Sequence, residues 1–130
     1  MIIATPPQTP APKPFGPKYG GMDGTRHLVT AIDGAPAFLK PARGRLWLMT
    51  ISLANPSALW KRLHERFCEV SLLRETERPF TEKEYETLQG GLFEHLVSLR
   101  ASGQSEFTEL KNGSHAFRNH FIRAMGPRRI

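Results

Sequence analysis

The first half of the hydrophobic pattern is typical of β-strands. Short apolar runs at 27–32 and 35–39 flank Asp33-Gly34, a pair that favours a hairpin turn because both turn positions need a positive φ. The run 45–53 is apolar on both faces, which is typical of a central strand covered on both sides or of one packed under helices. The pattern therefore predicts a three-stranded antiparallel β-meander over residues 26–53.

The second half of the pattern is typical of helices. After Asn55-Pro56, which favours a helix N-terminus, apolar residues recur every three or four positions. The spacing predicts one helix over residues 55–74 and, after a capping-box motif, a second over 81–102. Gly90-Gly91 lies inside the second helix, where a glycine costs about 1 kcal/mol relative to alanine. We interpret this pair as a weak point of the helix or as a close approach to a neighbouring helix or a second copy in a homodimer.

Residues 105–125 combine a short amphipathic piece, a glycine-containing turn and a longer amphipathic piece. In the longer piece Phe117, Phe121 and Met125 recur every four residues, which favours one apolar face of a helix. This layout predicts a helix-turn-helix-like hairpin, whose second helix would enter the major groove of DNA. The alternative is an ordinary helical hairpin with a solvated basic side.

The N-terminal residues 1–25 are rich in residues that break regular structure. Residues 4–21 hold six prolines and three glycines, and such a stretch buries too little apolar surface to offset its ordering entropy. We expect a flexible Pro-rich tail before a single domain at 26–130. The predicted fold class is α+β, with the N-terminal β-meander packed against three to four C-terminal helices.

Charge is distributed in blocks along the chain, whose formal net charge is +6. Residues 26–74 carry eight basic and three acidic side chains, and residues 111–130 carry five basic and no acidic ones. The intervening residues 75–110 carry three basic and eight acidic side chains. Basic blocks of this kind favour a polyanionic partner, and a solvated surface is the alternative.

Two surfaces are candidates for contact with nucleic acid. Arginine and asparagine can bind base edges, and lysine and arginine can neutralise phosphates. The residues expected to do so are Lys111, His115, Arg118, Asn119, Arg123, Arg128 and Arg129 of the predicted hairpin, with Arg43 and Arg45 of the predicted sheet. A competing surface that would stack single-stranded bases comprises Arg26, Lys40, Arg43, Arg45 and Trp47.

No motif in the sequence points to catalysis. Cys68 is a lone cysteine, and His115 and His120 are spaced too unfavourably on a helix to share a metal ion. Neither a phosphate-binding glycine loop nor a nucleophile elbow is present. We therefore expect a protein that is not an enzyme and has no catalytic residues, cofactor or metal. We also expect no membrane segment and a cytoplasmic location, because no long apolar run or secretory leader is visible.

These features favour a small basic nucleic-acid-binding protein, with DNA as the first choice, that acts as a regulator or accessory factor. The alternative is a protein-binding adaptor or inhibitor that occludes the surface of its partner, for instance a protein of a nucleic-acid-processing complex. The acidic block and the Pro-rich segment are compatible with that second function.

Overall fold

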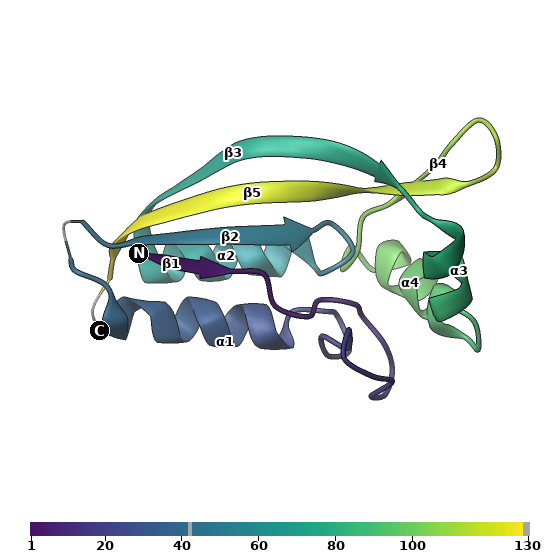
Figure 1. Ribbon diagram of the computed structural model, residues 1–130, viewed down its shortest axis with the longest axis horizontal. Helices are drawn as coiled ribbons and strands as arrows, with labels where there is room; N and C mark the ends of the chain where they lie inside the picture. Colours follow the sequence, from purple (N-terminus) through teal and green to yellow (C-terminus); the bar gives the residue numbers. More distant parts are fainter. Residues whose placement is uncertain (42, 129–130) are drawn as a thin grey trace.

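The centre of the protein is a mixed β-sheet. The computed structural model describes residues 1–41 and 43–128, and its sheet has the order β1-β2-β5-β3, with the short β4 also pairing with β5 (Figure 1). The strands are β1 Ile2–Ala4, β2 Arg45–Ile51, β3 Phe67–Pro79, β4 Thr108–Glu109 and β5 His115–Pro127. β1 runs parallel to β2 and the other pairs are antiparallel. The α+β class is confirmed, whereas the predicted three-stranded meander is wrong.

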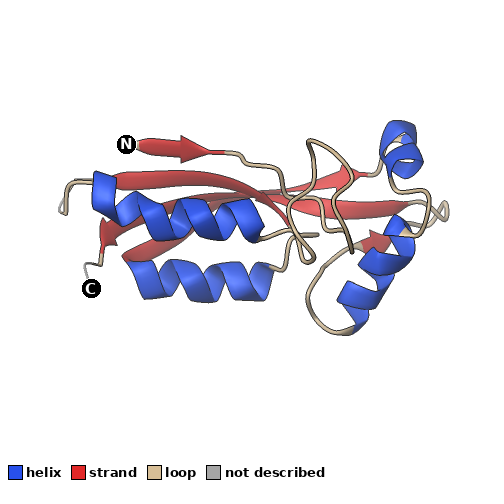
Figure 2. Ribbon diagram, turned by 90° about the horizontal axis from the view of Figure 1, so that it is seen from below, coloured by secondary structure: helices blue, strands red, loops and turns tan. Residues whose placement is uncertain are grey.

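Two helices cover one face of the sheet, and two others lie at its far end (Figures 1 and 2). The covering helices are α1 Arg26–Gly34, which continues into the 3-10 turn Ala35–Phe38, and α2 Pro56–Arg66. The helices at the far end are α3 Glu82–Thr87 and α4 Leu92–Ala101. Each pair of helices encloses a separate hydrophobic cluster against the strands.

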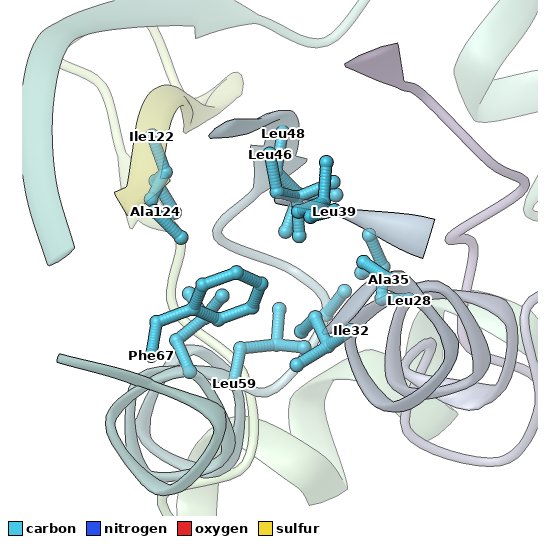
Figure 3. Packing of buried hydrophobic residues seen from close by; sticks show 12 residues of the cluster. Leu28, Ile32, Ala35, Leu39, Leu46, Leu48, Leu59, Phe67, Ile122 and Ala124 are labelled. Carbon is cyan, nitrogen blue, oxygen red and sulfur yellow. The ribbon is translucent and has the colours of Figure 1, made fainter. Parts of the chain in front are cut away.

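The main core lies between the sheet and helices α1 and α2 (Figure 3). Leu46 and Leu48 of β2 and Ile122 and Ala124 of β5 point toward the helices and are at most 2% exposed. Their partners are Leu28 and Ile32 of α1, Leu59 and Leu63 of α2 and Phe67 of β3. Because side chains alternate along a strand, the residue between Leu46 and Leu48 and the residue between Ile122 and Ala124 point to the other face.

The predicted strand at 27–32 is instead part of helix α1. Leu28 and Ile32 are four residues apart and share one buried helix face, a spacing that outweighs the local β-propensity. Asp33, predicted to form a turn, stays helical because Arg62 Nε and Nη2 donate to its carboxylate at 2.6 and 2.5 Å. Tertiary packing therefore overrides the hairpin signal.

The two long predicted helices are also shorter than expected. The chain turns extended at Phe67, so that residues 67–74 belong to the 13-residue strand β3 and not to a helix. Gly90 and Gly91 separate α3 from α4 with φ values of 73° and 93°, which glycine adopts readily. A Cβ at either position would meet nothing within 4 Å. The interpretation of a close approach to a neighbouring helix of the same chain is therefore wrong, whereas an approach to a second copy stays a prediction.

The predicted helix-turn-helix-like hairpin at 105–125 is not formed. Residues 108–109 are strand β4, and residues 115–127 are the long strand β5 in the middle of the sheet. A spacing of four residues places side chains on one face of a helix, but it does the same in a strand, whose period is two. The glycine turn at Asn112-Gly113 joins two antiparallel strands.

Residues 1–25, predicted to be a flexible tail, pack against the sheet and the start of α1. Strand β1 extends the sheet at β2, and the side chain of Gln8 continues this edge. Gln8 Nε2 donates to the Met49 carbonyl oxygen at 2.7 Å, and Gln8 Oε1 accepts from Ile51 N at 2.8 Å. Gln8 is 7% exposed. The prolines that break a continuous ladder do not prevent this side-chain pairing.

Acid is expected to weaken the packing of α1 against α2. Hydrogen bonds from Arg62 hold the pKa of the Asp33 carboxyl below its ordinary value of 3.8, although partial burial opposes them. A lowered folded-state pKa gives stability that is complete above the ordinary value and is lost as the pH falls through the folded-state pKa. The Tm advantage of the wild type over Asp33→Asn should therefore be a few degrees near neutral pH and shrink below about pH 4.

Thermal denaturation at several pH values measures this difference. Glu109→Gln is the matched control, because Glu109 is exposed and forms no ion pair among the described residues. A gap between wild type and Asp33→Asn that stays constant on acidification would contradict the role given to Asp33.

Candidate nucleic-acid interface

The strongest candidate surface is the side of the sheet that faces away from α1 and α2. We call it the open face, and its register follows from the strand pairing, in which Arg45 lies opposite Met125, Trp47 opposite Arg123 and Met49 opposite Phe121. On β3, Glu69, Ser71 and Arg74 lie opposite Met125, Arg123 and Phe121, and β1 adds Ile3 beside Trp47. Among the described residues no helix covers this part of the sheet (Figures 1 and 2).

Two aromatic side chains lie on the two central strands of the open face. Trp47 of β2 and Phe121 of β5 are diagonal neighbours, a relation that brings side chains within reach of each other. Both line a shallow hollow of about 200 Å³, whose walls also include Ile3, Thr5 and Met49. Phe121 is 36% exposed and Ile3 is 70% exposed. The open face therefore presents aromatic and aliphatic surface to solvent.

Guanidinium groups surround this apolar surface. Arg45, Arg74 and Arg123 lie on the open face, and among the described residues none of them forms an ion pair with a carboxylate. Arg45 Nε contacts Met125 Sδ at 3.2 Å. By contrast, Arg118 on the other side of β5 is paired with Glu75. The open face thus keeps its positive charge available for an anionic ligand.

Two buried donors on the open face lack a hydrogen-bond partner among the described residues. They are Trp47 Nε1 and Arg123 Nε, which belong to cross-strand neighbours. A buried N–H without an acceptor costs about 1–3 kcal/mol, so such groups are uncommon in folded proteins. The two donors are therefore candidates for hydrogen bonds to a ligand bound at this pair of strands.

The structure brings together only part of the predicted site. Arg45 and Arg123 lie on the open face, and Asn119 is half-buried on the same side of β5, nearer to α3 and α4. Arg43 is exposed two residues before β2 begins. Arg129 lies outside the described residues.

The remaining predicted residues lie elsewhere. Lys111 is exposed in the turn between β4 and β5, and Arg118 points to the opposite side of β5. His115 packs in the aromatic cluster at the far end, where its Nδ1 lies 3.1 Å from the Tyr85 hydroxyl. Arg128 follows β5, and its Nε donates to the Phe67 carbonyl oxygen at 3.3 Å.

The competing sheet surface is also only partly formed. Trp47 and Arg45 belong to the open face, whereas Arg26 begins helix α1 and its guanidinium lies 5.1 Å from the ring of Tyr19. Lys40 is exposed in the loop before β2. Phe121 and Arg74 were not predicted as site residues: Phe121 was assigned to the apolar face of a predicted helix, and Arg74 to the end of another. The alternation of buried residues at 120, 122 and 124, which places Phe121 on the exposed side, is seen in the folded chain and not in the sequence.

Other kinds of site find less support in the described part of the chain. No group of three or more His, Cys, Asp or Glu side chains there is arranged to hold a metal ion. The described helices are all too short or too polar to cross a bilayer. Comparison with protein-family models, curated proteins and solved structures gives no match for this chain. The function is therefore argued from the geometry of the open face.

Proposed function

We propose that this protein binds single-stranded nucleic acid on the open face of its sheet and acts as a small regulatory or accessory factor without catalysis. The observation that carries the proposal is the placement of Trp47 and Phe121 on the two central strands, beside guanidinium groups that form no ion pair with a carboxylate of the described residues. A cytoplasmic location would give such a protein access to its ligand.

The chemistry of the open face suits unpaired bases. An aromatic ring can stack on any base once that base is unpaired, and arginine beside it can bind the phosphates. Trp47 and Phe121 would stack two bases, while Arg45, Arg74 and Arg123 would follow the backbone. Reading a duplex in the major groove needs a protruding helix or ribbon, and the helix predicted for that task is a strand within the sheet.

Tryptophan fluorescence tests this proposal. In a Trp60→Phe variant the emission comes from Trp47, because the chain has two tryptophans. We expect a single-stranded oligonucleotide to quench this emission and added salt to reverse the quenching. A duplex of the same sequence should quench less. Tight duplex binding, or no quenching at low salt, would overturn the proposal.

The arginines of the open face should determine the salt dependence. Replacing Arg45 or Arg123 by alanine is expected to lower the slope of log affinity against log salt by about 0.7, the value for one phosphate contact on a single strand. Arg118→Ala is the matched control, because that arginine lies on the other side of β5 and pairs with Glu75. Equal slopes for Arg123→Ala and Arg118→Ala would contradict the assignment of the ligand to the open face.

A protein-binding adaptor or inhibitor is the second candidate, and strand β3 favours it. This 13-residue strand pairs only with β5 among the described strands and exposes Leu72 and Leu73 by 44% and 46%. An edge of this length can add a strand from a partner, although a bulge at Leu73 and flanking charges oppose such pairing. A stoichiometric protein partner that persists after nuclease treatment would favour this function.

A further inference from the structure

A second hollow lies at the other end of the molecule, between the loop that follows α4 and strands β3 and β5. Its volume is about 460 Å³, and none of the residues named above on the open face lines it. The side chains that matter for its chemistry are Glu75, Glu77, Arg100, Ser105, Glu106 and Arg118. We call it the Ser105 hollow.

Hydrogen bonds of Ser52 fix the loop that carries Ser105. Ser52 Oγ donates to the Glu106 carbonyl oxygen at 2.8 Å and accepts from Arg118 N at 2.9 Å. Ser52 thereby ties the loop to strand β5. The hydroxyl of Ser105 differs, because it is 2% exposed and its Oγ has no hydrogen-bond partner among the described residues. A buried hydroxyl without a hydrogen-bond partner is uncommon, and it indicates that a hydrogen-bonding partner is missing.

Among the described charged side chains that line the Ser105 hollow, those without a partner are negative. Arg118 is paired with Glu75, which also binds His120 Nε2 at 2.8 Å. Arg100 Nη1 donates to the Phe107 carbonyl oxygen at 3.2 Å, and its guanidinium lies 4.2 Å from the Phe107 ring. The two remaining carboxylates, Glu77 and Glu106, form no ion pair within the described part of the chain.

We propose that the Ser105 hollow binds a guanidinium group carried on an alkyl chain. Its N–H groups would donate to Glu77, Glu106 and the free Ser105 hydroxyl. Guanidinium fits better than a metal ion, because no described cluster of ligating side chains is suited to a metal, and a planar fork of donors matches two carboxylates. The alkyl chain would lie against the apolar wall formed with Ala116 and Phe117.

Calorimetric titration of the full chain with agmatine tests this site. We expect a Kd of about 1 mM or tighter and no heat from N-(4-aminobutyl)urea, the analogue in which a neutral urea replaces the guanidinium. Glu77→Gln and Glu106→Gln should each weaken agmatine binding about fivefold or more, and Ser105→Ala should weaken it by a similar factor. Glu94→Gln, which changes an exposed carboxylate on α4 outside the hollow, should have no effect.

A second arm identifies the source of the guanidinium. If Nα-acetyl-arginine amide binds as tightly as agmatine, the hollow is assigned to an arginine side chain of a partner. If agmatine binds more tightly, the hollow is assigned to a small free ligand that carries both a guanidinium and an amine. The proposal is overturned if agmatine does not bind at about 10 mM, if N-(4-aminobutyl)urea binds equally well, or if the glutamine variants, shown to be folded by circular dichroism, bind agmatine like the wild type. Because these variants leave the open face intact, oligonucleotide binding reports on the proposed function separately.

Discussion

Replacing Trp47 by alanine is expected to weaken the binding of a single-stranded oligonucleotide by about 10- to 100-fold. Loss of one base–aromatic stack costs about 1–3 kcal/mol, and each 1.4 kcal/mol is tenfold in affinity. Trp47 is half-buried on a central strand, and its indole also lines the hollow shared with Phe121. The loss should therefore exceed that of any single arginine on the open face at moderate salt.

Two further variants separate this effect from a loss of fold. Trp47→Phe keeps an aromatic ring and should retain most of the affinity. Trp60→Phe alters the other tryptophan, which stacks on His64 of helix α2, and should bind like the wild type. Titrations would be compared at equal salt after the Tm of each variant is measured. Wild-type affinity in a folded Trp47→Ala variant would show that Trp47 does not stack on the ligand.

Replacing Gln8 by alanine is expected to lower the free energy of unfolding by about 2–3 kcal/mol. The substitution removes two hydrogen bonds and leaves the Met49 carbonyl and the Ile51 N–H without partners at a largely buried edge, where each such group costs about 1–3 kcal/mol. The close packing of Gly24 under the Gln8 backbone leaves little space for rearrangement, because a Cβ at Gly24 would overlap the Gln8 carbonyl oxygen.

Urea denaturation measures this change in stability. Gln89→Ala is the matched control, since Gln89 is exposed in the turn after α3 and should shift stability by no more than about 0.5 kcal/mol. If Gln8→Ala and Gln89→Ala lower the free energy of unfolding equally little, residues 1–25 behave as the flexible tail that their proline content suggests. The packed N-terminal segment described above would then be contradicted.

Local signals in the sequence were sufficient for several elements. Asn55 caps α2 by accepting a hydrogen bond from Ala58 N at 3.4 Å, and Thr81 and Glu84 form the predicted capping box. The run that begins at Arg45 is a central strand, as its apolar pattern indicates, although among the described residues helices cover only one of its faces. These predictions succeeded because a cap or a continuous apolar run is determined by residues close together in the chain.

The remaining elements depend on contacts that sequence spacing does not reveal. Phe117, Phe121 and Met125 share one side in a helix and in a strand, so their spacing could not separate the two. Val70 continued the apparent helix from Leu63, although the chain turns extended at Phe67 to pair with β5. In each case a partner distant in sequence decides the local conformation.

The sequence predicted several residues of the candidate site but not how they are arranged. Arg45, Arg123 and Trp47 were identified, but they were divided between two competing surfaces, because a helix would have kept Arg123 away from the sheet. Pairing of β2 with β5 makes Trp47 and Arg123 direct neighbours. His115 and Arg118 were assigned to the site only through the predicted helix, and the strand directs them to other contacts.

Titration of the ¹⁵N-labelled protein with a single-stranded oligonucleotide of about ten nucleotides, followed by backbone amide NMR, tests the central claim most directly. We expect the largest shift changes at residues 45–49 and 119–125, with α2 and α4 little affected. The indole N–H signal of Trp47 should move, while that of Trp60 stays in place. Changes centred on the helices or on the outer edge of β3, with the signals of β2 and β5 unmoved, would contradict binding at the open face.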